Sequence, residues 1–372
     1  MTPYYDDGTV ALYLGDCLDV LRTLPDASAD AVVTDPPAGI AFMGREWDGD
    51  RGGRGQWTGW LAQRLAEAAR VLRPGAHALV WALPRTSHWT ATAIDDAGLE
   101  IRDCITHLFG SGFPKHKGAL KPAAEHWWLA RRPLCGTVAA NVAEHGTGAL
   151  SIDACRIPTS AADAEAMKRA NTPGSHRMKA GASPIGTFTR SSPSGALDTT
   201  QGRWPTNVVI SHLPECGAED GTPCAEGCAV AELDRQSGPS VSRIGKPRGA
   251  AAGDGWGMTK TGAEYADVGG ASRFFPVFRY AAKAPAAERP RLPDGTTWPT
   301  VKPLALMRWL VRLVTPPGGQ LIDPFAGSGA TGEAALIEGV RCLLIDSDPQ
   351  AAELAKTRLA RPIAPVLDLE AP

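Results

Sequence analysis

The chain has 372 residues, a length that allows one large domain or two ordinary ones. Of these residues 43% are hydrophobic and 21% are charged, a balance typical of globular proteins. No apolar run reaches the roughly 18 residues of a membrane helix, and the start MTPYYDDGTV is polar and acidic, so we expect a cytoplasmic protein without a membrane or secretory segment. A net charge of −2 excludes an overall basic footprint, and eight cysteines in such a chain argue against a disulfide framework.

The first third of the chain is predicted to alternate strands and helices. Short apolar runs predict strands at Val10–Leu14, Ala29–Thr34, His77–Ala82, Leu99–Phe109 and Glu125–Arg131, the last two as antiparallel partners. Helical spacing predicts helices at Leu18–Leu24, Gln56–Leu72 and Thr90–Ala97, and the tryptophans and leucines of the second helix are expected to face the core.

Asp35-Pro36-Pro37-Ala38 directly follows the predicted strand Ala29–Thr34. Ligands of open α/β sheets bind at the carboxyl ends of strands, so we expect chemistry here. The two prolines fix φ and remove N–H donors, which leaves carbonyl groups free to accept hydrogen bonds. Asp35 and the Pro36 carbonyl can accept both N–H groups of an exocyclic amine and so direct its lone pair toward a methyl donor. A plain strand-end cap is the alternative.

The segment GDCLDVLRTLPDASADAVVTDPP resembles the opening of DNA adenine-N6 or cytosine-N4 methyltransferases, whose catalytic motif is Asp/Asn/Ser-Pro-Pro-aromatic. This chain has Ala38 at the aromatic position. In the family the ring at that position stacks on the flipped base, and such stacking contributes roughly 1–3 kcal/mol. Phe42 and Trp47 are candidate replacements, or they pack within their loop. The resemblance also implies that Asp16 accepts the adenine amine of the cofactor, although a helix N-cap would look the same.

The loop GSGFPKHKGALKPAA joins the two predicted antiparallel strands and is locally basic, with Lys115, Lys117 and Lys121. Because it borders the proposed site, we interpret it as a clamp on DNA phosphates; a solvated loop is the alternative.

The middle of the chain is rich in Gly, Ser and Pro and has little periodicity, apart from a strand predicted at Trp204–Ser211 and helices at Ala161–Arg169 and Val230–Gln236. The resemblance implies that residues 136–270 are an inserted target-recognition region between a catalytic half, 1–135, and a cofactor-binding half, 271–372. Its basic residues could contact phosphates or guanine edges, or form a dispersed solvated surface. They are Arg203, Arg243, Lys246, Arg248, Lys260 and Arg273.

His212, Cys216, Cys224 and Cys228 place four soft ligands within 17 positions. They could hold a tetrahedral, structural zinc ion that staples a loop-rich region, or they could be free thiols, because the spacing lacks tight CxxC pairs.

The C-terminal part is predicted to form strands at Arg273–Tyr280, Leu321–Asp323 and Arg341–Ile345 and helices at Leu304–Val314 and Thr331–Glu338. The glycine-rich turn after Asp323 is neither GxGxxG nor a P-loop, so a nucleoside without a pyrophosphate fits it better.

The turn DPFAGSG, followed by an acidic strand end, resembles the S-adenosylmethionine-binding motif of DNA amino-methyltransferases. The resemblance implies that the cofactor contacts Asp323, Phe325, Ala326, Gly327, Ser328, Gly329 and Asp346. Trp298-Pro299-Thr300-Val301-Lys302-Pro303 resembles the family's (H)PT-x-KP motif, which would place Thr300 and Lys302 near the ligand. A plain helix start, with Thr300 as the N-cap, is compatible with that role.

The order of these motifs resembles the β arrangement of site-specific DNA amino-methyltransferases of actinobacterial or phage type. It implies a circularly permuted methyltransferase fold, an α/β doubly wound sheet that is mostly parallel with one antiparallel strand. We expect methylation of adenine N6 in double-stranded DNA, with cytosine N4 as the alternative. A DNA-binding protein with a degenerate site, or a methyltransferase acting on RNA or protein, are weaker alternatives. A homodimer and a cognate restriction nuclease are possible partners.

Overall fold

The structure is a computed structural model of the chain that describes residues 1–112, 114, 116–159, 202–213, 215–217, 223–241, 268–278, 284 and 288–361. The chain divides into two compact units. The larger comprises Met1–Cys155, Asn207–Ala229 and Val277–Pro372, and the smaller comprises Arg156–Thr206 and Val230–Pro276. The predicted helix Ala161–Arg169, together with Lys115, Arg243, Lys246, Arg248 and Lys260, lies outside the described residues.

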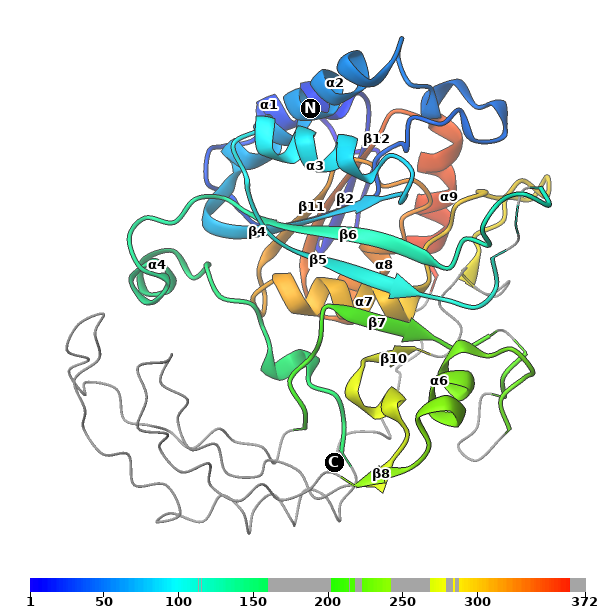
Figure 1. Cartoon of the computed structure of the whole chain (residues 1–372). Helices are drawn as coiled ribbons and strands as arrows, with labels where there is room; N and C mark the ends of the chain where they lie inside the picture. The colour runs from blue at the N-terminus through cyan, green and yellow to red at the C-terminus, as the bar shows by residue number, and fades with distance from the viewer. Residues whose placement is uncertain are drawn as a thin grey trace, which may run out of the picture. The chain divides into compact units, whose positions relative to one another are not determined.

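The larger unit is built on a sheet whose described strands follow the order β1-β2-β12-β11-β3-β4-β6-β5-β7-β10 (Figure 1). Their bounds are Tyr5–Asp6 (β1), Val10–Leu14 (β2), Ala29–Thr34 (β3), Leu72–Ala82 (β4), Glu100–Leu108 (β5), Ala124–Arg131 (β6), Val208–Ser211 (β7), Val277–Phe278 (β10), Gln320–Asp323 (β11) and Arg341–Asp346 (β12).

Strands β2, β12, β11, β3 and β4 pair in parallel, and β6 runs antiparallel to both of its neighbours, β4 and β5. Strands β5, β7 and β10 are parallel again. The prediction of a mostly parallel sheet with one inserted antiparallel strand is therefore confirmed. The two-residue β1 adds a short antiparallel strand at one edge.

Helices cover both faces of this sheet, which makes the unit doubly wound (Figure 1). On one face lie α1 (Cys17–Thr23), α2 (Arg54–Val71) and α3 (Ser87–Asp96), and on the other α7 (Leu304–Val314), α8 (Ala330–Ile337) and α9 (Pro349–Leu359). The helix α4 (Val138–His145) follows β6 in the chain.

Strand β3 shows why the central strands lack a regular alternation of polar and apolar residues. All six of its residues are buried. Ala31 and Val33 pack into the core beneath α7–α9, whereas Ala29 and Val32 pack into the core beneath α1–α3. Because a parallel strand in this position has no face in water, alternation disappears from its sequence.

In the smaller unit, the described residues form the helix α6 (Ala229–Ser237) and the antiparallel strands β8 (Ser240–Val241) and β9 (Val268–Gly269). The first residue of α6, Ala229, is assigned to the larger unit. Asp234 of α6 accepts hydrogen bonds from the backbone N–H and the hydroxyl of Ser272, both at 2.7 Å. This carboxylate fastens the helix to the 3-10 turn at Ala271–Phe274.

Most predicted elements are present with ends shifted by a few residues, but two predicted strands are wrong in extent. Of the predicted strand Arg273–Tyr280, the first two residues end the 3-10 turn and only Val277–Phe278 form a strand, β10, while residues 279 and 280 lie outside the described part of the chain. The strand predicted from Trp204 begins only at Val208, after Pro205. The helices α4 and α9 were not predicted. Among the described residues, no helix is long and apolar enough to cross a membrane.

Candidate active site at the carboxyl edge of the sheet

Four aspartates lie at or just past the carboxyl ends of adjacent strands. Asp35 follows β3, Asp323 ends β11, Asp346 ends β12, and Asp16 follows β2 by two positions. These strands are parallel neighbours, so their carboxyl ends share one edge of the sheet. The structure thus brings together residues from both ends of the chain where open α/β sheets bind ligands.

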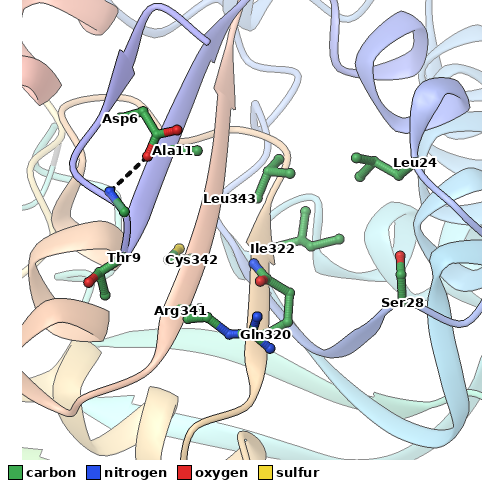
Figure 2. Close-up of a pocket in the computed structure, with 11 residues that line it drawn as sticks. Asp6, Thr9, Ala11, Leu24, Ser28, Gln320, Ile322, Arg341, Cys342 and Leu343 are labelled. Carbon is green, nitrogen blue, oxygen red and sulfur yellow. Dashed lines mark hydrogen bonds between the residues drawn. The ribbon is translucent and has the colours of Figure 1, made fainter. Parts of the chain in front are cut away.

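A larger cavity, of about 360 Å³, lies at the opposite end of these strands (Figure 2). It is lined by Gln320 and Arg341, the first residues of β11 and β12, and by Asp6. The Asp6 carboxylate accepts a hydrogen bond from the Gly8 N–H at 2.8 Å and so serves a local turn. This cavity does not contain the predicted site residues.

The glycine-rich turn between β11 and α8 is fixed by close backbone packing. Gly327 and Gly329 have φ of +51° and +77°, which side-chain-bearing residues rarely adopt. A Cβ on Gly329 would lie 3.0 Å from that of Ala355 on α9, so the turn and α9 approach each other closely. Ala326 and Ser328 are 7% and 3% exposed, so their side chains belong mainly to the core.

Asp323 joins the turn to the neighbouring strand. It is 2% exposed and accepts hydrogen bonds from the Thr34 hydroxyl at 2.6 Å and from the Phe325 N–H at 3.1 Å. Burial raises the pKa of Asp323 to about 6, although these hydrogen bonds oppose the shift. In this structure Asp323 therefore has the geometry of a buried link between β3 and the turn.

Asp346 orients the same turn from β12. Its carboxylate accepts hydrogen bonds from the Gly327 N–H at 2.7 Å and the Asp348 N–H at 2.9 Å. Burial raises the pKa of Asp346 to about 7, against the effect of both hydrogen bonds. The side chain is only half-buried and borders a cavity, where it can accept further hydrogen bonds from a ligand.

A cavity of about 120 Å³ lies beside Asp346 and Asp16. Two aromatic side chains line it, Phe325 and Trp60, and their ring centroids are 5.6 Å apart. Its other lining residues are Cys17, Arg51, Arg64, Pro324 and Ser347. Asp16 is an N-cap, accepting from Leu18 N–H at 2.8 Å, and it also lines the cavity. The N-cap is confirmed, and the contact with the cofactor stays a prediction that is compatible with it.

Sequence reasoning missed Arg51, Trp60 and Arg64 in this cavity. Arg64 Nη2 lies 2.8 Å from Asp16 Oδ2, and the Arg51 guanidinium lies 3.8 Å from the centre of the Trp60 ring. Trp60 was assigned to the helical core stripe, yet it is half-buried and lies beside the cavity. The stripe itself is confirmed at Trp57, Leu61 and Leu65, which are buried.

Lys302 connects the TVKP segment to the DPPA segment. Its Nζ lies 2.9 Å from Asp35 Oδ2, and the two side chains are 13% and 23% exposed. The same ammonium lies 3.7 Å from the centre of the Trp81 ring, a cation–π contact. Burial raises the pKa of Asp35, Lys302 opposes that shift, and Glu125 and Asp48 add to it. Lys302 therefore favours the ionised carboxylate that an amine requires as an acceptor.

The alternative assignment of Thr300 as a helix N-cap is wrong. Helix α7 begins at Leu304, with Pro303 in the N-cap position, and the Leu304 N–H donates to Glu288 Oε2 at 2.8 Å. Thr300 is half-buried in the segment that leads to Lys302.

The loop after the DPPA segment is organised by Asp48, which sequence reasoning also missed. This carboxylate is 1% exposed and accepts hydrogen bonds from the N–H groups of Ala38, Gly39 (3.1 Å) and Phe42 (2.8 Å). The loop is strained, because Ala41 is among its non-glycine residues with positive φ. No sequence signal marks Asp48, since its three partners are backbone groups.

The candidate base-stacking rings differ in surroundings. Trp47 stacks on Trp298 at 5.9 Å and 18°, which covers one of its faces. Phe42 is 37% exposed. Trp81, at the end of β4, is 9% exposed, and its Nε1 donates to Glu125 Oε2 at 3.1 Å. Phe42 is therefore the more accessible of the two predicted rings, and Trp81 is an unpredicted ring close to Asp35.

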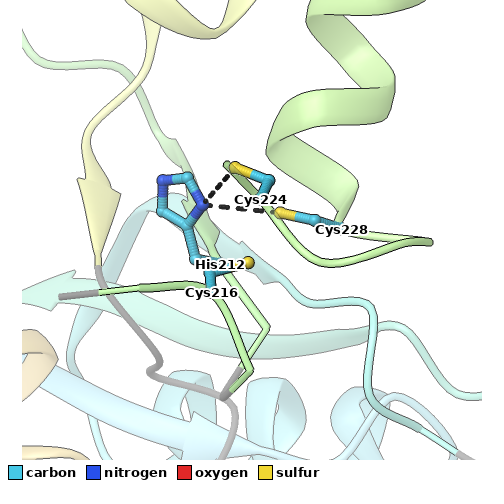
Figure 3. Close-up of side chains that lie close together, drawn as sticks. All are labelled: His212, Cys216, Cys224 and Cys228. Carbon is cyan, nitrogen blue, oxygen red and sulfur yellow. Dashed lines mark hydrogen bonds between the residues drawn. The ribbon is translucent and has the colours of Figure 1, made fainter. Parts of the chain in front are cut away.

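The predicted DNA-contacting residues also differ. Lys117 and Lys121, in the loop between β5 and β6, are exposed. Arg203 is 5% exposed and lies 5.0 Å from the centre of the Phe274 ring within the smaller unit, which favours a packing role. The metal-binding atoms of His212, Cys216, Cys224 and Cys228 lie within 4.8 Å of one another (Figure 3).

Comparison with known proteins gives consistent results. The N6/N4 methyltransferase family, described as DNA methylase, matches residues 29–357. The type II methyltransferase M.BamHI of Bacillus amyloliquefaciens is 27% identical over 112 residues, which cover 30% of this chain and 26% of that protein. The putative methylase YubD of Escherichia coli (strain K12) is 37% identical over 84 residues, which cover 20% of this chain and 37% of that protein. The matches thus span only 26% and 37% of the length of these curated relatives.

Among solved structures, the PvuII DNA methyltransferase, named as cytosine-N4-specific, superposes with a TM-score of 0.51 and 14% identity. The match covers 98% of this chain and 91% of that one. At this identity the likeness shows a shared fold.

Proposed function

Because this chain belongs to the N6/N4 DNA methylase family, we propose that it transfers a methyl group from S-adenosylmethionine to the N6 amine of an adenine in duplex DNA. The observation that supports this most directly is the position of Asp35, at the same sheet edge as the glycine-rich turn and Asp346. A methyl donor held at that turn and an amine held at Asp35 would be neighbours.

The residues around the smaller cavity fit the donor. The Asp346 carboxylate can accept hydrogen bonds from ribose hydroxyls, Asp16 can accept from an adenine amine, and Phe325 offers an aromatic surface. The donor contributes an electrophilic methyl group on a sulfonium ion. The protein's residues bind and orient it.

The residues around Asp35 would act on the amine that receives the methyl group by positioning it and by electrostatic stabilisation. Asp35 and the Pro36 carbonyl would each accept one N–H of the amine, which turns the nitrogen lone pair toward the methyl group. The methyl group would pass from the donor's sulfonium sulfur to the amine nitrogen, and ionised Asp35 would stabilise the positive charge that develops on that nitrogen. The amine then loses a proton to water. Lys302 holds Asp35 in place without touching the nitrogen.

The target base must leave the duplex, because its amine cannot reach Asp35 from within the stack. We propose Phe42 or Trp81 as the ring that replaces the aromatic residue absent at Ala38. The exposed Lys117 and Lys121 would contact phosphates, and the smaller unit would contribute to target recognition. A cytoplasmic location, a homodimer and a cognate restriction nuclease remain predictions from the sequence.

Cytosine N4 is the second candidate, because both amines present the same two N–H groups to Asp35. The deciding experiment is transfer of labelled methyl groups to duplex DNA of mixed sequence, followed by nucleoside analysis. N6-methyladenine supports the proposal and N4-methylcytosine supports the second candidate. RNA labelled in preference to DNA would contradict both.

Two variants sharpen this experiment. Asp35→Ala should abolish transfer and leave donor binding intact, whereas the exposed Asp19→Ala should behave like the unaltered protein. Donor binding without transfer by the unaltered protein would instead indicate a degenerate site.

A further inference from the structure

Four metal-binding side chains converge just beyond the end of β7. His212 follows the strand directly, and Cys228 immediately precedes α6. His212 Nδ1 lies 3.5 Å from Cys224 Sγ and 3.4 Å from Cys228 Sγ, and Cys216 completes a group whose ligand atoms all lie within 4.8 Å of one another. In Figure 3 the imidazole and the three thiols come from separate points of the connection and point toward one another.

Two of these separations match a four-coordinate zinc centre. Zinc binds thiolate sulfur at about 2.3 Å and imidazole nitrogen at about 2.0–2.1 Å, and a tetrahedron with these arms separates nitrogen from sulfur by about 3.5 Å. The two separations from His212 Nδ1 agree with that value. One imidazole and three thiolates also make a closed set in which protein fills every position, as in structural zinc sites.

The surroundings indicate what such an ion would stabilise. The His212 N–H donates to the Phe278 carbonyl at 2.9 Å, which ties the cluster to β10. A Cβ on Gly110 would lie 3.1 Å from Leu213 and 3.2 Å from the Gly227 carbonyl, so the loop after β5 packs directly on the cluster's own chain. That loop carries Lys117 and Lys121.

We propose that His212, Cys216, Cys224 and Cys228 bind one structural zinc ion, which fixes the connection between β7 and α6 and supports the first residues of the β5–β6 loop. This connection spans 17 positions, and its described residues contribute no side chain to the main hydrophobic core. A metal ion supplies cross-links that a hydrophobic core supplies elsewhere. The site lies apart from the proposed chemistry and leaves the methyl-transfer proposal unchanged.

Elemental analysis of the full chain, purified without chelators, tests the proposal directly. We expect about one zinc per chain, reduced at least fivefold in Cys224→Ser. Cys135→Ser is the matched control, because Cys135 is an exposed free cysteine outside the cluster, and it should retain the full zinc content. Zinc below a tenth of an equivalent in the unaltered protein, or equal loss in both variants, would overturn the proposal.

A spectroscopic measurement covers the case in which Cys224→Ser fails to fold. After exchange of the metal for Co²⁺ in the unaltered chain, tetrahedral thiolate ligation should give intense visible d–d bands and a near-ultraviolet charge-transfer band. Weak bands typical of octahedral oxygen ligation would contradict it. On zinc removal, hydrogen exchange should rise at least tenfold around Gly110 and stay unchanged in α8; unchanged exchange at Gly110 would refute the supporting role. Neither readout depends on methyl transfer.

Discussion

Lys302 lies 2.9 Å from Asp35, so the segment before α7 and the segment after β3 meet through one ion pair. Here burial raises the pKa of Asp35 and the ammonium opposes that rise.

The first prediction concerns this pair. In Lys302→Met the pKa of Asp35 should rise further, because burial then acts unopposed, and the acidic limb of the rate profile should move to higher pH. A rise of one pKa unit would cost about tenfold in activity on that limb. Lys302→Arg should keep the limb near its original position. An unshifted profile in Lys302→Met would show that Asp35 does not need the pair.

The second prediction concerns Asp346, whose pKa is raised to about 7. Ionised carboxylate is the stronger acceptor for ribose hydroxyls, so the Kd for the donor should fall as pH rises from 6 to 8. In the free protein, the same raised pKa makes the folding stability fall as pH rises, whereas donor affinity rises. The group binds more protons when folded, so its contribution to stability is complete below its unfolded pKa and is lost as pH rises through about 7.

Calorimetric titration of the donor and denaturant unfolding across this pH range measure both effects. Asp346→Asn should remove both pH dependences. If donor affinity in the unaltered protein is constant between pH 6 and 8, Asp346 does not act as an ionised acceptor.

The third prediction concerns Asp48. Asp48→Ala should leave buried backbone N–H groups without acceptors and destabilise the protein by on the order of 2 kcal/mol or more. Because the released loop carries the DPPA segment, kcat should fall more than donor affinity. Denaturant unfolding and donor titration measure the two effects. Glu46→Ala, which removes an exposed carboxylate of the same loop, should change neither.

The fourth prediction concerns the missing ring. If Phe42 stacks on the flipped base, Phe42→Ala should weaken binding of duplex containing an unpaired target base by roughly 1–3 kcal/mol. The neighbouring Met43, 75% exposed, offers the control Met43→Ala, which should bind normally. Normal binding by both variants would shift the assignment to Trp81.

The fifth prediction concerns the basic loop. Lys117→Ala with Lys121→Ala should lower affinity for duplex DNA uniformly across sequences. The slope of log K against log salt should become shallower by about 2, because each lysine would neutralise one phosphate and release its counterion. Arg22→Ala, an exposed change on α1, should leave the slope unaltered. An unchanged slope in the double variant would place the phosphate-binding residues elsewhere.

The elements that sequence predicted best are those governed by burial alone. The bounds of β3 and α7 coincide with Ala29–Thr34 and Leu304–Val314, because a parallel strand covered on both faces is mostly apolar without alternation and a helix on a sheet has a sharp apolar stripe. His212, Cys216, Cys224 and Cys228, which were grouped from their spacing, also converge in the structure, and metal binding by them stays a prediction.

Predictions from the sequence missed elements and site residues where one residue type serves two structural roles. Asp348 ends the acidic turn after β12 and also caps α9 by accepting from Gln350 N–H at 2.7 Å, and this helix was not predicted. Trp60 has helical spacing suited to the core but borders the cavity. The roles assigned to the site residues stay predictions until the variants above are measured.

The division of the chain has an evolutionary consequence. The smaller unit is encoded in two pieces, with β7 and the four metal-ligand residues between them. If that unit selects the target, a single crossover between homologous genes would separate its halves. New specificities would then arise more readily by substitutions within the unit than by shuffling it whole, and a laboratory graft would need to exchange Arg156–Thr206 and Val230–Pro276 together while leaving Asn207–Ala229 in place.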